Sequence, residues 1–373
     1  MLGNTFLVGA FGPVLPEIAR TRGLADWQLG VVAGAFGFAR MAGAMPAGVL
    51  AGRHVGASLV LSPAFLAVGL LCVTAGPNFW LLVLGRALMG VGHTLLMVGG
   101  LTAILRDDKG ADASLRLNTF EFSGMLGILG GLLVIGVLPS AWSWNLSLAV
   151  ASAPLIVSAL VGRSLLHRFP PTPPPPRASS EAPPPAATRG VRVFWLMLMV
   201  GITMAFAWSS VSQFLIPLRG TREFGLDRGG ISVLLGLAQV VDLIVLLPTG
   251  RVADRVGRVP VLATLMLVLG LGAVGTGLGS YPLFVAGCAA FGLGLAGWML
   301  PLGIAREHGG AEGLAWRTAL YRVGTDAAIF LGPVLSGLLG ERAARLFVAA
   351  IGLAALAAGA RLLLRPLPRS PRG

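Results

Sequence analysis

Seven ionisable side chains interrupt long apolar stretches of this 373-residue chain, and their types could do chemistry. In chain order they are Arg40, Arg86, His93, Glu121, Asp242, Arg322 and Asp326. At the centre of a membrane-spanning helix such a group costs roughly 2.5 to 3.5 kcal/mol on insertion scales. Unpaired, lipid-facing copies should be rare, so we expect these residues to bind substrate, carry protons or pair between helices.

The composition places the chain among polytopic membrane proteins. It is 55% hydrophobic and only 12% charged, which is too little polar surface to cover a soluble globule of this length. A net charge of +13 suggests nucleic acid in a soluble protein, but here the arginines gather in short loops and tails, where they set topology and meet anionic lipid. Cys72 and Cys288 are single and far apart, and they indicate neither a disulfide framework nor a metal site.

Apolar runs of about 17 to 25 residues are long enough to cross a hydrocarbon core about 30 Å thick as helices. Helix is the expected state because an open sheet edge in lipid leaves backbone groups unsatisfied. The first run lacks the basic start and small-residue end of a signal peptide, so we interpret it as a span. The twelve predicted spans are 2–19, 27–51, 57–76, 79–105, 115–138, 142–165, 193–217, 229–250, 259–279, 282–305, 316–339 and 343–364.

A proline-rich segment, 169–191, divides the spans into six and six. Proline removes a backbone donor and clashes with the preceding helical turn, so this segment is predicted to be an extended linker; recognition of a partner by its prolines is the alternative. The predicted domains are a six-helix half, 1–168, the linker, a second half, 192–365, and a basic tail, 366–373.

The distribution of arginines predicts the orientation in the plasma (inner) membrane. With both termini, the linker and the tail in the cytoplasm, most basic residues lie inside, as the positive-inside rule requires. Those left outside are Arg20, Arg22, Arg219, Arg222, Arg228, Arg342 and Arg345. The first span disagrees with this topology, because it has no basic residue before it and two just after it.

Two landmarks recur at an offset of 202 residues, which predicts an internal duplication. The loop Pro46–Gly56 matches Pro248–Pro260, with Gly52 standing where Asp254 does. The run GRALMGVG from Gly85 matches GCAAFGLG from Gly287. Small residues at this spacing let helices approach closely, and parallel halves with a site between them are a common transporter architecture. Arg40 and Asp242 occupy equivalent positions of the two halves at the same offset.

The second loop resembles the G-x-x-x-D-[RK]-x-G-[RK] signature that the major facilitator superfamily carries between helices two and three and again between eight and nine. The matching residues are Gly250, Asp254, Arg255, Gly257 and Arg258. Arg86, Gly90 and Gly92 resemble the R-x-x-x-G-x-G pattern of the fourth helix. The segment GILGGLL only partly resembles the family's proton-antiporter motif G-P-x-x-G-G, and its proline is missing. The resemblance implies an all-α polytopic membrane protein of twelve transmembrane helices in two pseudo-symmetric six-helix halves.

The family's helix packing implies two pairs between the halves. Helix two packs on eleven and five on eight, which predicts an Arg40–Asp326 ion pair, with Arg322 on the same helix. The second packing predicts a Glu121/Asp242 couple. Two carboxylates in one poorly hydrated site can share a proton, as a proton-coupled cycle needs. The alternative is that all of these are ties between helices that never titrate.

The substrate contacts are predicted on spans four and seven. Arg86 and His93 lie two turns apart on one face of the fourth helix, which lines the cavity in the family, and a membrane-embedded arginine can contact an anion. A tie to a backbone carbonyl and a satisfied buried imidazole are the alternatives. A polar and aromatic band on span seven suits a small organic substrate, although packing through serine hydroxyls also explains it; it comprises Trp208, Ser209, Ser212 and Gln213.

The resemblance assigns the signature loop the role of a latch. Asp254 would be held by the positive end of the dipole of span five and released as the halves rock. Gly52 cannot supply this charge, which predicts a latch on one side only.

No nucleotide-binding, zinc-hydrolase or clustered Cys/His motif is present, so we expect no enzyme activity, cofactor or metal. Coupling must come from an ion gradient or from the substrate's own gradient. The sequence predicts a monomeric secondary transporter that works by alternating access, with a small-molecule substrate exported against protons. Uptake of a small anion or organic acid is the alternative, favoured by Arg40, Arg86 and Arg322. A non-transporting membrane assembly or sensor protein is a further one.

Overall fold

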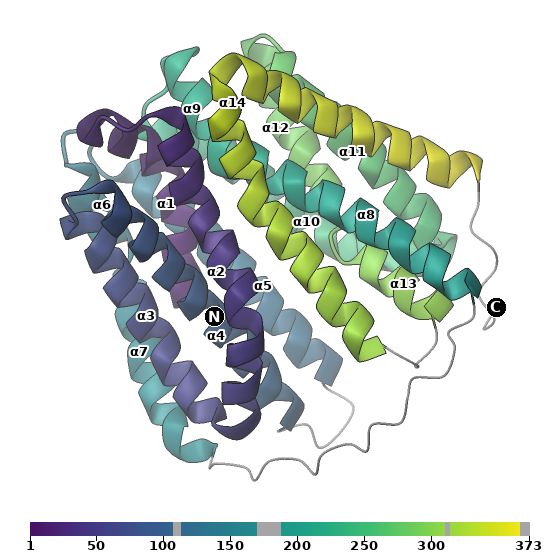
Figure 1. Ribbon diagram of the computed structural model, residues 1–373, viewed down its shortest axis with the longest axis horizontal. Coiled ribbons are helices and arrows are strands. Elements are labelled where there is room, and N and C mark those ends of the chain that lie inside the picture. The colour runs from purple at the N-terminus through teal and green to yellow at the C-terminus, as the bar shows by residue number, and fades with distance from the viewer. Residues whose placement is uncertain (107–112, 170–187, 310–313, 366–373) are drawn as a thin grey trace. The chain divides into compact units, whose positions relative to one another are not determined.

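The computed structural model describes residues 1–106, 113–169, 188–309 and 314–365, and within these ranges it is helical, without strands (Figure 1). Ten of its helical stretches are long and apolar enough to cross a membrane. The predicted class of an all-α polytopic membrane protein is thereby confirmed. The predicted tail and all but the ends of the predicted linker lie outside the described residues.

The helices before the linker follow the predicted spans closely except in the sixth. That span, 142–165, is interrupted at Ser152 and Ala153, where Pro154 begins a new helix because proline has no N–H to continue the previous one. The helices are α1 (Leu2–Arg22), α2 (Asp26–Arg53), α3 (Val55–Ala75), α4 (Phe79–Arg106), α5 (Ala113–Val137), α6 (Trp144–Ala151), α7 (Pro154–Leu165) and the 3-10 turn η1 (Leu166–Arg168).

The helices after the linker contain two irregularities that the sequence did not reveal. A π-helical turn, η2 (Val211–Leu215), interrupts the predicted seventh span, and the predicted tenth span, 282–305, is broken between Leu295 and Leu300. The predicted boundary between the last two spans falls at Gly340, whose φ of +74° kinks α14. The helices are α8 (Thr188–Ser210), α9 (Ile216–Arg222), α10 (Arg228–Val256), α11 (Arg258–Leu278), α12 (Tyr281–Leu295), α13 (Leu300–Gly309) and α14 (Leu314–Leu364).

The chain forms two compact units. The first unit is Met1–Ala178 with Pro217–Gly236, and the second unit is Ser179–Ile216 with Leu237–Gly373. All of α9 after Ile216 and the first part of α10 therefore belong to the first unit, although they come after the linker. Helix α10 passes from the first unit into the second at Gly236.

The same helix crossing occurs in each unit at the predicted offset. In the first unit a Cβ on Gly90 of α4 would lie 2.5 Å from the carbonyl oxygen of Phe36 on α2. In the second unit a Cβ on Gly292 of α12 would overlap the carbonyl oxygen of Ala238 on α10. Both crossings require glycine because the backbones touch.

The turns that precede α2 and α10 also repeat. Gly23 ends α1 at φ 60°, and Gly225, at the same offset of 202, follows α9 at φ 64°. Glycine reaches this left-handed conformation without steric cost, so it terminates the helix. The amide of Gly230 donates to Asp227 Oδ1 (2.9 Å), which caps the start of α10. These turns place Asp26 and Arg228 at equivalent helix starts.

Most of the predicted loop Pro248–Pro260 is helical, so our expectation of a charged loop was wrong in its conformation. Helix α10 continues to Val256 and α11 begins at Arg258. Only Gly257, with φ +106°, leaves the helical region between them. Asp254 therefore lies on the last turn of α10, at a corner between two helices.

Candidate functional site

Arg86 lies on α4 in the first unit, where its side chain is 1% exposed. Its guanidinium carbon is 3.8 Å from the ring centroid of Phe11 on α1 and 5.0 Å from that of Phe36 on α2. Its Nη1 points to the sulfur of Met89 at 3.8 Å, and its Nε has no hydrogen-bond partner. Among the described residues no carboxylate contacts Arg86. A guanidinium held between aromatic faces without a counter-ion can pair with an anion.

Phe36 brings together three of the predicted site residues. Its ring centroid lies 5.9 Å from the Arg40 guanidinium, 5.0 Å from that of Arg86 and 5.5 Å from the ring of His93. The negative face of an aromatic ring attracts cations. Sequence reasoning grouped Arg86 with His93 but missed Phe11 and Phe36, since a phenylalanine in a membrane span carries no signal that distinguishes the interior from lipid.

Asp242 is the buried carboxylate of α10 in the second unit. Its side chain is 7% exposed, and its Oδ1 has no hydrogen-bond partner. It lies one turn after Ala238, where α10 meets Gly292 of α12. The part of the chain that the structure describes offers it no ion pair. Burial of a charged carboxylate without a partner is costly, and the neutral acid avoids that cost.

The remaining predicted residues of the second unit lie along α8, η2 and α14. Ser209 donates to the carbonyl of Ala328 at 3.1 Å and so ties α8 to α14. The ring of Trp208 contacts that of Trp298, with centroids 6.5 Å apart. Ser212 and Gln213 lie on the π-helical turn η2, a feature that is frequent at functional sites. Asp326 is buried on α14, and Arg322 lies one turn before it.

The two predicted pairs, Arg40–Asp326 and Glu121–Asp242, each have one member in each unit. Glu121 lies on α5, where its side chain is exposed, and Arg40 lies on α2, where it is half-buried. Both pairings stay predictions.

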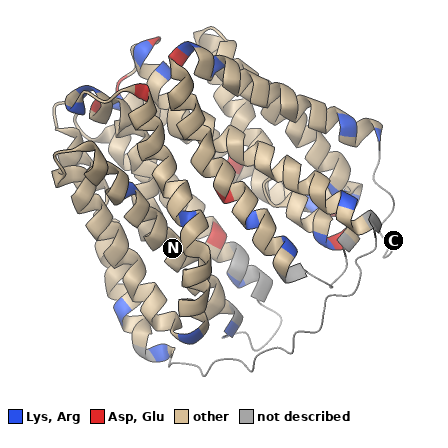
Figure 2. Ribbon diagram, in the orientation of Figure 1, with Lys and Arg blue, Asp and Glu red and all other residues tan. Residues whose placement is uncertain are grey.

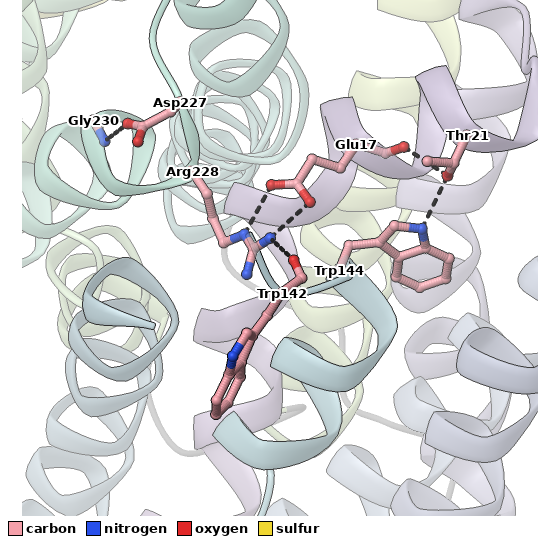
Figure 3. A network of polar contacts seen from close by, with 7 residues as sticks. All are labelled: Glu17, Thr21, Trp142, Trp144, Asp227, Arg228 and Gly230. Atoms are coloured by element: carbon pink, nitrogen blue, oxygen red, sulfur yellow. Dashed lines mark hydrogen bonds and ion pairs between the residues drawn. The ribbon is translucent and has the colours of Figure 1, made fainter. Parts of the chain in front are cut away.

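A network of ion pairs joins the start of α10 to α1 (Figure 3). Arg228, 4% exposed, donates from Nε and Nη2 to the two carboxylate oxygens of Glu17, each at 2.8 Å. Its Nη2 also donates to the carbonyl of Trp142 at 3.0 Å, whereas its Nη1 has no partner. Nearby, Arg222 donates from Nη2 and Nη1 to the two carboxylate oxygens of Asp26 at 2.7 and 3.1 Å.

A cavity of about 610 Å³ lies beside this network within the first unit. Its walls are formed by the end of α1, the turn before α2, Ser140, and the segment from the end of α9 to the start of α10. The lining residues are Pro13, Pro16, Glu17, Ala19, Arg20, Gly23, Leu24, Ser140, Leu218, Thr221, Arg222, Gly225, Leu226, Asp227, Arg228 and Ile231.

Sequence reasoning missed this region, because it used Arg20, Arg222 and Arg228 only as signals of topology. One signal could have found it. At the offset of 202, Asp26 corresponds to Arg228, an exchange of charge like that between Arg40 and Asp242.

At the helix corner of the signature, Arg258 joins two acids of the second unit. Its Nη1 lies 2.7 Å from Glu307 on α13, and its Nη2 lies 3.8 Å from Asp254. In the first unit the carbonyl of Gly52, which replaces the aspartate, accepts a hydrogen bond from Arg106 at 2.6 Å. Charged residues are sparse along the helices and gather toward their ends (Figure 2). The predicted contact of Asp254 with the start of α5 concerns different units and stays a prediction.

The family and its relatives are identified by comparison with known proteins. The family model described as Major Facilitator Superfamily matches residues 1–241 and 214–373. An uncharacterized MFS-type transporter of Yersinia pestis (strain Pestoides F) is 24% identical over 351 residues, covering 91% of this chain and 86% of that protein. A protein of the same description from Yersinia pseudotuberculosis (serotype O:3, strain YPIII) matches equally.

Solved structures share the fold over nearly the whole chain. The crystal structure of a POT family transporter in complex with 5-aminolevulinic acid has a TM-score of 0.81 at 12% identity, covering 97% of this chain and 93% of that one. The nucleoside transporter NupG has a TM-score of 0.71 at 14% identity, covering 97% and 96%. With the family model matched across both halves, the chain belongs to the Major Facilitator Superfamily and is a membrane transporter of this type.

Proposed function

We propose that the protein is a proton-coupled secondary transporter that exports a small molecule across the plasma membrane by alternating access, with both termini cytoplasmic. The observation that carries this proposal is Asp242, a buried carboxylate with no hydrogen bond to its Oδ1. An acid in this setting stays protonated while it is shut away from water, and it exchanges its proton only when water reaches it.

Exchange of substrate for a proton follows from the protonation of Asp242. The carboxylate of Asp242 takes a proton when the site opens to the outer solution and gives it up when the site opens to the cytoplasm. Glu121 is the proposed partner that shares this proton. Substrate and proton would then occupy the site in turn, which couples export to proton entry.

The ion pairs of the first unit support alternating access. Arg228 and Arg222 tie the start of α10 and the end of α9 to α1 and α2, while the rest of α10 belongs to the second unit. We propose that these pairs close the outer end of the route and separate when it opens. Arg258, joined to Glu307 and Asp254, is the proposed counterpart at the cytoplasmic end.

A toxicant-resistance assay in an efflux-deficient host tests the proposal. The host would express the wild type or Asp242→Asn, each with and without an uncoupler. We expect the wild type to confer resistance to at least one compound, and expect either treatment to abolish it. Full proton dependence of transport by Asp242→Asn would remove this residue from the coupling mechanism. Arg163→Gln, an exposed residue at the end of α7, is the control for expression and insertion.

Uptake of a small organic anion is the second candidate function, and Arg86 favours it. Its guanidinium is buried, contacts two aromatic rings and has no carboxylate partner among the described residues. Counterflow of labelled organic acids into proteoliposomes tests this function. We expect Arg86→Lys to slow counterflow, because an ammonium cannot offer an anion the bidentate donor geometry of a guanidinium. Counterflow at the wild-type rate would exclude Arg86 as the anion contact.

A further inference from the structure

We propose that the cavity between the end of α1 and the start of α10 binds a small organic anion, a carboxylate with an apolar body. The proposal concerns binding in this cavity of the first unit and does not rest on proton coupling. It is carried by hydrogen-bond donors that lack partners, by the internal repeat and by the character of the cavity walls.

Three donors at this cavity have no partner within the described ranges. Nη1 of Arg228 is buried and makes no hydrogen bond, and Figure 3 shows this third nitrogen without a contact. The hydroxyl of Thr221 is likewise buried and makes no hydrogen bond. The guanidinium of Arg20 is exposed at the cavity wall and makes neither an ion pair nor a hydrogen bond.

The acids at the cavity already accept hydrogen bonds. Both oxygens of Glu17 accept from Arg228, and Oδ1 of Asp227, an exposed residue, caps the start of α10. Arg222 is held by Asp26. The unused hydrogen-bonding capacity is therefore dominated by donors, two of them cationic. A ligand that satisfies them must supply acceptors and negative charge.

The internal repeat explains the excess of positive charge at this cavity. At the offset of 202, Arg20 corresponds to Arg222 and Asp26 corresponds to Arg228. The repeat counterpart of the ion pair Arg222–Asp26 is therefore Arg20 with Arg228. Both of these arginines line the cavity, and Arg228 stands at the position where the repeat would place an acid. Arg228 is already paired with Glu17, so a bound carboxylate would supply a counter-charge to Arg20 and accept a hydrogen bond from Nη1 of Arg228.

The other walls determine what else the anion must carry. Much of the remaining lining is apolar, and it comprises Pro13, Pro16, Leu24, Leu218, Leu226 and Ile231. The volume of about 610 Å³ lies in the range typical of sites for small organic ligands. These walls would leave an inorganic anion in poor contact, so an apolar body of several carbons is expected beside the carboxylate.

Equilibrium binding of radiolabelled hexanoate to the full-length protein in lipid nanodiscs tests the proposal. The assay is run without any ion gradient, and binding to empty nanodiscs is subtracted. Unlabelled hexanoate, hexanamide, hexylammonium and inorganic phosphate are compared as competitors. We expect hexanamide to compete about tenfold less well than hexanoate because it lacks the charge that strengthens the hydrogen bonds. Hexylammonium and phosphate should not compete.

Substitutions of cavity residues test whether hexanoate binds in this cavity. Thr221→Val, which keeps the ion pairs, should weaken hexanoate binding about tenfold, and Arg20→Gln about threefold, since this arginine is exposed. Arg163→Gln, a matched loss of an exposed arginine in the same unit, should bind like the wild type. Equal competition by hexanamide, or wild-type binding by both cavity variants, would overturn the proposal. So would a loss of binding confined to Arg86→Lys, because the anion would then lie at Arg86.

The outcome is independent of the transport mechanism. Asp242→Asn is expected to bind hexanoate as the wild type does, whether or not it transports. Failure of this variant to transport therefore bears on the proposed proton coupling, whereas failure of the wild type to bind hexanoate bears on the cavity.

Discussion

Arg228 and Glu17 form a bidentate ion pair, with both N–O distances at 2.8 Å, that joins positions 211 residues apart in the chain. Arg228 is buried, while the arginine of a nearby bidentate pair, Arg222 with Asp26, is more exposed. The cost of losing an ion pair depends on how much of the remaining charge stays buried. The two pairs therefore predict different responses to loss of one acid.

Glu17→Gln should destabilise the protein by about 3 kcal/mol, because Arg228 would keep a buried charge without its carboxylate. The measurement is the denaturation midpoint of the purified protein in mild detergent. Exchange of the two charges, Glu17→Arg with Arg228→Glu, should recover part of the loss. Asp26→Asn is the matched control, and it should cost less than about 1 kcal/mol because its pair is exposed to solvent. Equal losses in the two single variants would show that burial of Arg228 is not what matters.

Gly90→Ala and Gly292→Ala should each destabilise the protein by about 1 to 3 kcal/mol. A Cβ at either position would press on a backbone carbonyl of the neighbouring helix, and the helices would have to move apart. Gly43→Ala on α2 is the control, because a Cβ there meets nothing within 4 Å. It should be neutral or stabilising by up to about 1 kcal/mol, since alanine favours helix over glycine. The measurement is thermal unfolding of the three variants. Wild-type stability of both Gly90→Ala and Gly292→Ala would contradict the close approach of the helix backbones.

Phe36→Leu should remove the aromatic face that Arg40, Arg86 and His93 share. We expect a loss of stability of about 1 to 2 kcal/mol beyond that of Phe38→Leu, an exposed position on the same helix. A double-mutant cycle with Arg86→Met separates the ring–cation term from simple packing. A coupling energy near zero in that cycle would show that Phe36 only fills space.

Much of the architecture was predictable because equivalent turns and helix crossings recur at the offset of the internal repeat. The offset of 202 found at two landmarks also holds for Gly23 and Gly225, which end equivalent helices, and for Phe36 and Ala238, which Gly90 and Gly292 contact. Hydrophobic runs located the spans, but not the π-helical turn η2 or the break before Pro154. These irregularities depend on packing against neighbouring helices, which periodicity does not encode.

The candidate site was predictable only in part, for a related reason. Mid-span charge drew attention to Arg86 and Asp242, because the cost of burying charge is a property of the residue itself. Phe11 and Phe36, the ring partners of Arg86, could not be found, since an aromatic side chain in a membrane span can face either lipid or the protein interior. Glu17 and Arg228 lie at span ends, where charge is ordinary, and only their contact gives them significance.

Asp242→Asn should separate stability from transport. Asparagine has nearly the same shape as aspartate but no charge to bury, so the variant should be at least as stable as the wild type in thermal unfolding. It cannot carry a proton, and proton-driven transport in proteoliposomes should be lost. Residues held in an unfavourable setting for the sake of function commonly show this combination. A marked loss of stability would instead mean that the carboxylate is held by an ion pair, and Asp242 would then be a structural tie between helices.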